Sequence, residues 1–339
     1  MFTALRELVA RAASALETPE RESTCVPRSR RLALAFLIAV FGGTLAYAFM
    51  RRPGFYADFL SPWFAARALL AGANPYTAVP SMPPYNISDP PVYPYPTLLA
   101  IVPFAGLPVT AAGALFFALS SGLLAYGITR TGYHRLPLFL GAPYFMVASL
   151  GQWAPLVMAA ALLPAMSWAV ILKPNLGLAL FAYRPSWRAI VIGTAVLLLS
   201  VVVAPWWPAA WLRNVQAGTG KLMPLAAPAG FLLLLALWRW RRASARLLLA
   251  MACVPQVFLF ADQLPLWLIP RTLRQSLVLT LLGHLAALAW LASLKPGEPP
   301  FLAGVPFVIT LVYLPALILV LLEPGRPPSA TVPHSDAGH

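Results

Sequence analysis

Long apolar runs recur along this chain, and they constrain its fold more than any other feature. The first run extends from Leu32 to Met50 without a charged residue, which is long enough to cross about 30 Å of hydrocarbon. The whole chain is 60% hydrophobic and only 10% charged, whereas a soluble domain carries about 25% charged residues. A chain this apolar cannot cover itself with polar surface, so we predict that lipid surrounds most of its length.

The runs predict an all-α polytopic membrane protein with about nine to ten transmembrane helices. The expected spans are 32–50, 109–129, 136–150, 153–172, 189–204, 225–238, 247–260, 276–294 and 301–322. Residues 176–183 are too short to cross and are expected to form a re-entrant or broken helix. A polar tail over 1–31 precedes this transmembrane domain of 32–322, and a tail over 323–339 follows it. The first run is too long for the core of a signal peptide, so we expect it to be uncleaved.

Lysine and arginine are unequally divided between the two sides that these spans define. The side of the N-terminal tail receives Arg130, Arg135, Lys173, Arg184, Arg188, Arg239, Arg241, Arg242, Arg246 and Lys295. The other side receives Arg51, Arg52, Arg67, Arg213, Lys221, Arg271, Arg274 and Arg326. Because cytoplasmic loops are rich in Lys and Arg, we predict a multi-pass plasma membrane protein with a cytoplasmic N-terminal tail. The same bias explains the net charge of +14 without a nucleic-acid partner.

The segment 51–108 is long for a loop between spans, and this orientation makes it extracytoplasmic. Phe59 to Ala71 has an apolar face and is expected to form a helix on the membrane surface. Prolines punctuate the stretch that follows, above all from Pro90 to Pro96. Proline fixes φ and lacks an N–H, so we expect this stretch to be extended and to form a lid or pocket wall.

Acidic residues are scarce, which narrows the search for a general base. Of the ten in the chain, five lie in the tails and Glu298 and Glu323 flank the last span, which leaves Asp58, Asp89 and Asp262, all on the extracytoplasmic side. Asp58 closely follows the first span among aromatic residues, where burial would raise its pKa toward a useful range. The alternative is that Asp58 caps the helix beginning at Phe59. Asp89 precedes a proline and is more simply a turn residue, and Asp262 is expected to pair with Arg271 or Arg274 or to cap a helix.

Other polar and aromatic residues carry weaker signals. Gln152 is expected to hydrogen-bond between helices, and Lys173 to mark the cytoplasmic end of a span. His284 lies inside a span, where bridging between helices is favoured over a functional role. The cluster of Trp206, Trp207 and Trp211 favours an interfacial aromatic belt over sugar stacking. No His or carboxylate spacing suits a metal and no Gly-rich phosphate loop is present, so neither a metal nor a cofactor is predicted.

Several short motifs occur in the order seen in a known family. They are Phe55-Tyr56-Ala57-Asp58-Phe59, Gly72-Ala73-Asn74-Pro75-Tyr76, Tyr93-Pro94-Tyr95-Pro96, Gly151-Gln152 and Leu172-Lys173-Pro174. Over residues 32–215 the chain resembles glycosyltransferase family 87, the GT-C type transferases that use polyprenyl-phosphate sugars. That family includes the mycobacterial mannosyltransferases of phosphatidylinositol mannoside synthesis. Trp153 departs from the pattern, because a small polar residue commonly follows the glutamine in the family.

The resemblance implies a GT-C type helical bundle with an extracytoplasmic active site. It implies inverting transfer of a sugar, typically mannose, from a polyprenyl-phosphate donor to a hydroxyl of a lipid or glycan acceptor. Asp58 matches the catalytic aspartate of the family. Arg271 and Arg274 are expected to bind the donor phosphate, with anchoring to lipid headgroups as the alternative. The expected substrate pocket contains Tyr56, Tyr76, Tyr93, Tyr95, Gln152 and Asp262. Two other functions stay open: a transporter or flippase of lipid-linked sugars, and an inactive family member that serves as an assembly partner.

Overall fold

The computed structural model describes residues 26–52, 58–77, 81–82, 85–86, 91–217, 221–258, 260–296 and 300–324. Its α-helices are α2 (Arg28–Met50), α3 (Leu60–Leu70), α4 (Tyr95–Ile101), α5 (Val109–Ile128), α6 (Ala142–Leu150), α7 (Ala154–Leu162), α8 (Pro174–Tyr183), α9 (Trp187–Val203), α10 (Trp207–Ala217), α11 (Ala243–Cys253), α12 (Leu273–Ser293), α13 (Pro300–Ala303), α14 (Val305–Val308) and α15 (Leu314–Leu321). The 3₁₀ helices are η1 (Val102–Phe104), η2 (Thr129–Thr131), η3 (Leu136–Leu140), η4 (Pro164–Leu172), η5 (Pro224–Ala226), η6 (Gly230–Arg239) and η7 (Leu264–Leu268), and η8 (Ile309–Tyr313) is a π-helix. Two short antiparallel strands, β1 (Ser81–Met82) and β2 (Tyr85–Asn86), complete the described elements.

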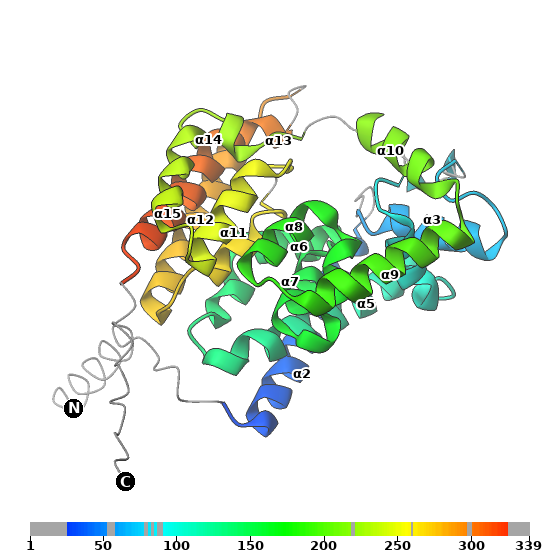
Figure 1. Ribbon diagram of the computed structural model, residues 1–339, viewed down its shortest axis with the longest axis horizontal. Coiled ribbons are helices and arrows are strands. Elements are labelled where there is room, and N and C mark those ends of the chain that lie inside the picture. The colour runs from blue at the N-terminus through cyan, green and yellow to red at the C-terminus, as the bar shows by residue number, and fades with distance from the viewer. Residues whose placement is uncertain are drawn as a thin grey trace, which may run out of the picture.

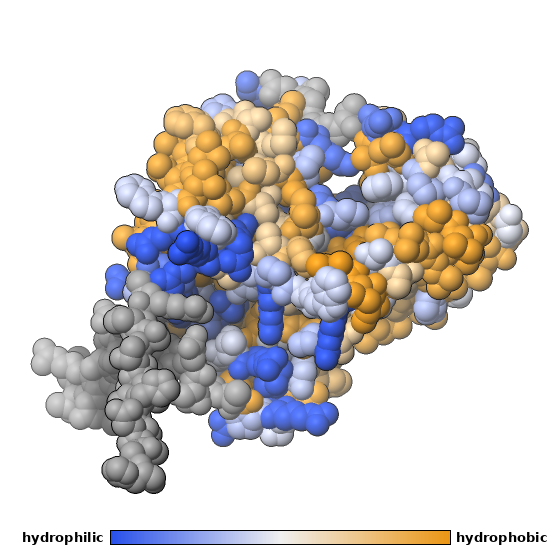
Figure 2. All heavy atoms as spheres, viewed as in Figure 1, coloured by the Kyte–Doolittle hydropathy of each residue, from blue (hydrophilic) through white to orange (hydrophobic). Residues whose placement is uncertain are grey.

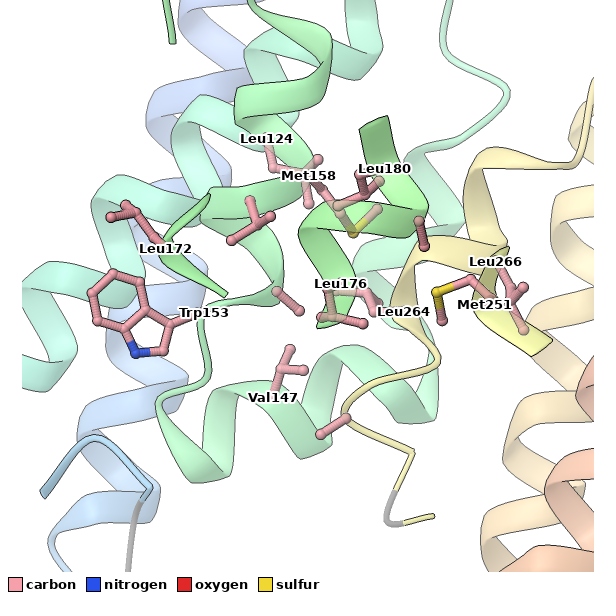
Figure 3. Close-up of a cluster of buried hydrophobic side chains, with 14 of the residues drawn as sticks. Leu124, Val147, Trp153, Met158, Leu172, Leu176, Leu180, Met251, Leu264 and Leu266 are labelled. Carbon is pink, nitrogen blue, oxygen red and sulfur yellow. The ribbon is translucent and has the colours of Figure 1, made fainter. Parts of the chain in front are cut away.

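The helices form two groups with α6, α7 and α8 between them, as Figure 1 shows. One group contains α11, α12, α14 and α15, and the other contains α3, α5, α9 and α10. A shared core connects them, because buried side chains of α5, α7, α8, η7 and α11 meet in one apolar cluster (Figure 3). Large apolar side chains of α2, α9 and α12 remain on the surface, and the face over α9 is visibly apolar in Figure 2. Such faces suit contact with lipid.

Three helices are long and apolar enough to cross a membrane, namely α2, α5 extended through Thr131, and α12. The number rises to five if each of two bent helix pairs is one span. The all-helical membrane-protein fold is therefore supported, but about nine to ten full spans are not confirmed. Many expected spans are divided by proline, of which the chain has 36. Proline removes a helical hydrogen bond and clashes with the preceding turn, so an apolar run becomes two short helices.

The largest departure from expectation lies in residues 153–172, which do not form one straight span. Leu163 has extended backbone angles (φ −104°, ψ 108°), α7 ends before it, and η4 begins at Pro164 and packs back along α7. The chain thereby returns to the end of the bundle from which it started. Lys173 consequently lies beside Gln152, so the expectation that the two residues mark opposite ends of one span is wrong.

Helix α8 then runs antiparallel to α11 and defines the two ends of the bundle. At one end, the Asn175 amide donates to the Pro255 carbonyl at 3.2 Å, and at the other, Arg246 Nε donates to the Ala182 carbonyl at 2.8 Å. Gly177 lets α8 approach η4, because a Cβ atom there would lie 1.8 Å from the Val170 carbonyl oxygen. We call these the Lys173 end and the Arg242 end, after a residue beside each. The helix over 176–183, which we expected to be re-entrant or broken, is part of α8 and connects these two ends.

A second departure concerns Arg271 and Arg274, which do not lie at the end that carries Asp262. Helix η7 leads the chain away from Asp262, and Arg135 Nε donates to the Pro270 carbonyl at 3.3 Å. Arg271 pairs with Glu323 at 2.9 Å, and the same Glu323 oxygen lies 3.7 Å from Arg242. Their expected position beside Asp262 is therefore wrong, because the short helix η7 (Leu264–Leu268) separates them from it.

Helix α12 carries the chain back, so Lys295 also lies at the end opposite to the one predicted. Trp290 packs against Phe260, with ring centroids 5.8 Å apart, and its indole N–H donates to the Pro300 carbonyl at 2.7 Å. His284, also on α12, has its Nε2 atom 2.8 Å from the Leu140 carbonyl oxygen. This hydrogen bond links two helical elements, as the bridging interpretation of His284 predicted.

Within the first loop, α3 lies where a helix over Phe59 to Ala71 was expected. The proline-rich stretch is less extended than predicted, because α4 begins at Tyr95. Pro96 occupies the first turn of α4, where no N–H is needed for an intrahelical hydrogen bond, so proline does not prevent the helix.

Candidate functional site

Asp58 lies immediately before α3, where the first loop meets the end of α6. The Phe59 N–H donates to the Leu150 carbonyl at 3.2 Å, which fixes this part of the loop against α6. Phe59 holds the N-cap position of α3, and no side-chain hydrogen bond caps that helix. The capping interpretation of Asp58 is thus not what the structure shows. Asp58 is exposed, and its carboxylate is directed toward the corner that follows α6.

That corner is Gly151-Gln152, and its shape requires glycine. Gly151 has φ +63°, which side chains rarely adopt, and a Cβ atom there would lie 2.5 Å from Met50 Cε and 2.8 Å from Phe59 Cβ. The Gln152 N–H donates to the Val147 carbonyl at 2.9 Å, which ends α6 and turns the chain. The corner presents the Gln152 side chain between the first loop and the segment that contains Lys173.

A chain of hydrogen bonds connects the two carboxylates at this end of the bundle. The Gln152 amide donates from Nε2 to Asp58 Oδ2. Its Oε1 atom accepts from Lys173 Nζ at 2.8 Å, and the same ammonium donates to Asp262 Oδ1 at 2.7 Å. The second Asp262 oxygen accepts from the Val257 N–H at 3.1 Å. Residues 58, 152, 173 and 262, which are far apart in sequence, therefore form one connected site.

The charges on either side fix the orientation of the Gln152 amide. Its N–H faces a carboxylate and its oxygen faces an ammonium. In the flipped orientation the amide oxygen would face the carboxylate and the amide N–H would face the ammonium, and neither contact could be a hydrogen bond. Thr97 Oγ1 donates to the Leu172 carbonyl at 2.6 Å and holds the backbone beside Lys173. Figure 3 shows the neighbouring side chains Trp153 and Leu172 at one edge of the apolar cluster. Polar groups at the site are thus held against a packed apolar wall.

The ion pair between Lys173 and Asp262 is buried, with 10% and 7% of the two side chains exposed. Burying two charges carries a desolvation penalty that often exceeds their attraction, so such a pair is weak evidence of a stabilising role. Buried ionisable groups in an apolar helical protein more often serve function. The pair therefore marks this end of the bundle as a candidate site.

Tyr93 contributes a phenol to the same site. Burial raises its pKa well above the usual range for tyrosine, and the negative charges of Asp58 and Asp262 raise it further. The phenol therefore stays protonated and can act as a donor but not as a base. Its backbone carbonyl accepts from the Tyr76 hydroxyl at 2.9 Å, and its ring packs against Trp153 with centroids 5.8 Å apart.

The other expected pocket residues have different positions. Tyr76 and Tyr95 are buried, and each makes an edge contact with Trp206 (centroids 6.2 and 6.0 Å apart). Trp211 donates its indole N–H to the Val92 carbonyl at 2.9 Å, which ties α10 to the same segment. These aromatic residues build the wall behind Tyr93, and Figure 2 shows the molecule hollowed beside α10. Tyr56 and Asp89 lie outside the described residues.

The cation that the described residues bring to this site is Lys173, which sequence reasoning had assigned elsewhere. Arg271 and Arg274 are not brought to it, because they follow η7 to the Arg242 end. A signal for Lys173 was present, since the chain has only three lysines and this one follows an apolar run as part of Leu172-Lys173-Pro174. From the sequence we expected Asp262 to pair with Arg271 or Arg274 or to cap a helix. In the structure it pairs with Lys173.

Across the part of the chain that the structure describes, no group of three or more His, Cys, Asp or Glu residues could hold a metal ion. No protein-family profile, curated protein or solved structure matches the chain. Functional interpretation therefore depends on the site itself and on the motifs that compose it.

Proposed function

We propose that this protein is a membrane glycosyltransferase that moves a sugar from a polyprenyl-phosphate donor to a hydroxyl of a lipid or glycan acceptor. One observation carries the proposal. Residues from three of the motifs that resemble glycosyltransferase family 87, namely Asp58, Gln152 and Lys173, meet in one hydrogen-bonded chain. Tyr93, from a fourth motif, adjoins them. Short motifs that resemble a family by accident have no reason to converge on one site.

The proposed reaction is a single inverting displacement. Asp58 accepts the proton of the acceptor hydroxyl as general base. The acceptor oxygen forms a bond to the anomeric carbon while the bond from that carbon to the phosphate oxygen breaks. The electron pair of the broken bond leaves on polyprenyl phosphate. The hydrogen bond from Gln152 orients the Asp58 carboxylate, so that proton transfer needs no rearrangement.

Lys173 is the proposed stabiliser of the leaving phosphate. An ammonium has three N–H donors, and Gln152 and Asp262 accept two of them. The third can donate to a phosphate oxygen, where charge develops as the sugar leaves. Asp262 in turn keeps the ammonium in place. This assignment replaces Arg271 and Arg274, which we no longer propose as phosphate ligands.

The test is sugar transfer by the purified protein in liposomes, using a radiolabelled polyprenyl-phosphate mannose donor and a panel of membrane lipid acceptors. Asp58→Asn keeps the size and hydrogen-bonding shape of the side chain but cannot accept a proton at neutral pH. We expect its transfer rate to fall by roughly 10²–10⁴-fold with normal folding. Wild-type rates in this variant would remove Asp58 as the base. A protein that transfers no sugar from any lipid-linked donor would refute the proposal.

A second function is favoured by the same buried ion pair. Ion-coupled transporters carry ionisable residues inside the membrane region, and Lys173 and Asp262 are such residues. A proton-coupled transporter or flippase of lipid-linked sugars would move its substrate without breaking the sugar–phosphate bond. Movement of intact donor across proteoliposomes that responds to a pH gradient would favour this function, whereas cleaved donor favours transfer.

A further inference from the structure

A second group of buried polar side chains lies next to the candidate site, among the C-terminal helices. Gln256, Gln263 and Tyr313 are each completely buried. The Tyr313 hydroxyl donates to Gln256 Oε1 at 2.7 Å, and Gln263 Nε2 donates to the same oxygen at 2.9 Å. Burying such groups is costly unless they are hydrogen-bonded, so an apolar core would have been the simpler solution here.

Gln256 is fixed from both its side chain and its backbone. Its Nε2 atom donates to the Met251 carbonyl, at the end of α11. Its N–H and carbonyl exchange two hydrogen bonds of 3.0 Å with Leu222. These hydrogen bonds fix the position of Gln256, and with it the start of the loop that follows.

That loop carries Asp262, and the same polar group closes it. The Val257 N–H donates to Asp262 Oδ2 at 3.1 Å, and Gln263 Nε2 lies within 3.4 Å of the Val257 carbonyl. Phe260, between them, has φ +63°, an unfavourable conformation for a residue with a side chain. Such strain persists only where the surrounding structure determines it, and it clusters at functional sites.

Tyr313 reaches this loop from an irregular turn of the C-terminal helix. Residues Ile309–Tyr313 form a π-helix between α14 and α15. A π-helical turn holds one extra residue and shifts the side chains that follow it, and such turns are frequent at functional sites. The irregular turn therefore delivers the phenol to Gln256 from a helix that does not otherwise supply a residue to the site.

We infer that Gln256, Gln263 and Tyr313 are positioning residues that hold the Asp262 loop so that Asp262 fixes Lys173. The inference rests on the proposed function for its catalytic consequence, and it gives the C-terminal helices a role in the reaction. Two hydrogen bonds connect Tyr313 through Gln256 to Gln263, the residue that follows Asp262. Loss of the phenol should let the carboxylate and the ammonium drift from the reacting geometry, which lowers turnover more than binding.

The experiment uses Tyr313→Phe, which removes one hydroxyl and leaves Gln256 Oε1 its bond from Gln263. The full-length protein is prepared with ¹⁵Nζ-lysine, which gives only three side-chain signals because the chain has three lysines. Loss of one signal in Lys173→Arg assigns Lys173. We expect Tyr313→Phe to shift this signal, and to lower kcat by about tenfold while the donor KM changes by less than about twofold.

Tyr144→Phe is the matched control. Tyr144 is also fully buried, and its hydroxyl donates to Ser121 at 2.8 Å, between α6 and α5. Its loss removes an equivalent hydrogen bond without touching the Asp262 loop, so neither the Lys173 signal nor kcat should change. Gln263→Met is a second test of the loop. It removes both hydrogen bonds donated by the Gln263 side-chain amide and keeps a side chain of similar volume.

An unmoved Lys173 signal in both Tyr313→Phe and Gln263→Met would overturn the inference, and so would an equal shift in Tyr144→Phe. The spectroscopic result does not depend on turnover. Absence of sugar transfer by the wild-type protein would therefore refute the proposed function alone, whereas an unmoved signal in an active protein would refute the positioning role alone.

Discussion

The two ends of the bundle contain ion pairs of similar length in very different surroundings. At the Lys173 end, Lys173 and Asp262 are 2.7 Å apart with 10% and 7% of their side chains exposed. At the Arg242 end, Arg271 and Glu323 are 2.9 Å apart with 46% and 12% exposed. Figure 2 shows hydrophilic side chains gathered near the end of α15, where this second pair lies. The two pairs have similar distances between their charged atoms, but they differ in the exposure of the cation to solvent.

This difference determines what each pair can contribute. An exposed pair is screened by water and contributes about 0–1 kcal/mol. The attraction within a buried pair roughly offsets the free energy lost when both charges leave water. Removing one partner is costly, because the other charge then stays buried and unpaired. The buried pair therefore signals a use other than stability, while a partly buried arginine at the other end, Arg239, donates to the Leu321 carbonyl at the end of α15.

The largest effect on stability is expected at Lys173. Lys173→Met keeps an unbranched side chain only one atom shorter but leaves the Asp262 carboxylate buried without its cation. We expect the free energy of unfolding in detergent to fall by about 3–5 kcal/mol, and sugar transfer to be lost. Denaturant unfolding with a fluorescence readout measures the first, and the donor assay the second.

The double variant Lys173→Met with Asp262→Leu sharpens this test. Replacing both members of a buried ion pair by apolar residues is often neutral for stability, so most of the lost free energy should return while transfer stays absent. A double variant that regained activity would show that the pair has no part in the reaction. A single variant that cost less than about 1 kcal/mol would show that burial does not distinguish the two ends.

The next effect concerns the corner that presents Gln152. Gly151→Ala combines a positive φ with a Cβ atom that meets Met50 and Phe59, so we expect a loss of roughly 1–3 kcal/mol of unfolding free energy. Gly72→Ala has φ +72° but open space around it, and Gly106→Ala has neither problem. Thermal denaturation should rank the three variants in that order. Equal stability of all three would show that the corner does not need glycine.

A smaller effect is expected at the Arg242 end. Arg271→Gln removes a half-exposed charge from Glu323, which keeps Arg242 at 3.7 Å. The loss of unfolding free energy should be at most about 1 kcal/mol, and the donor KM should not change. A raised KM for the polyprenyl-phosphate donor would contradict the two-ended picture, because it would place a phosphate ligand away from Lys173.

The smallest effect is the response to salt. Raising the ionic strength from about 0.01 M to 1 M shortens the Debye length from roughly 30 Å to 3 Å. The stability difference between the wild-type protein and Arg271→Gln should then shrink toward zero. The difference between the wild-type protein and Lys173→Met should persist, because buried pairs are screened much less. Parallel loss of both differences would mean that solvent reaches both pairs equally.

Much of the candidate site was predictable from the sequence, because charged residues are rare in an apolar chain. With ten acidic residues and most of them near the termini, few carboxylates could serve an active site, and Asp58 and Asp262 were among them. The structure brings both to one end of the bundle. The partner of Asp262 could not be predicted, because charge and spacing favoured Arg271 and Arg274 as strongly as any lysine.

The sequence by itself determined that the chain forms apolar helices, and it located α2, α5 and α12, whose long runs contain no proline to interrupt them. It also determined which few side chains could ionise among those helices. Only the tertiary structure decided where the chain reverses. Residues 153–172 are apolar on both sides of the reversal at Leu163-Pro164, and η7 is as apolar as the helices around it, so composition shows neither the reversal nor the separate short helix. The missed reversal at Leu163-Pro164 misplaces Lys173, and the crossing of α8 then restores the expected ends, so that Asp262 returns to the end of Asp58.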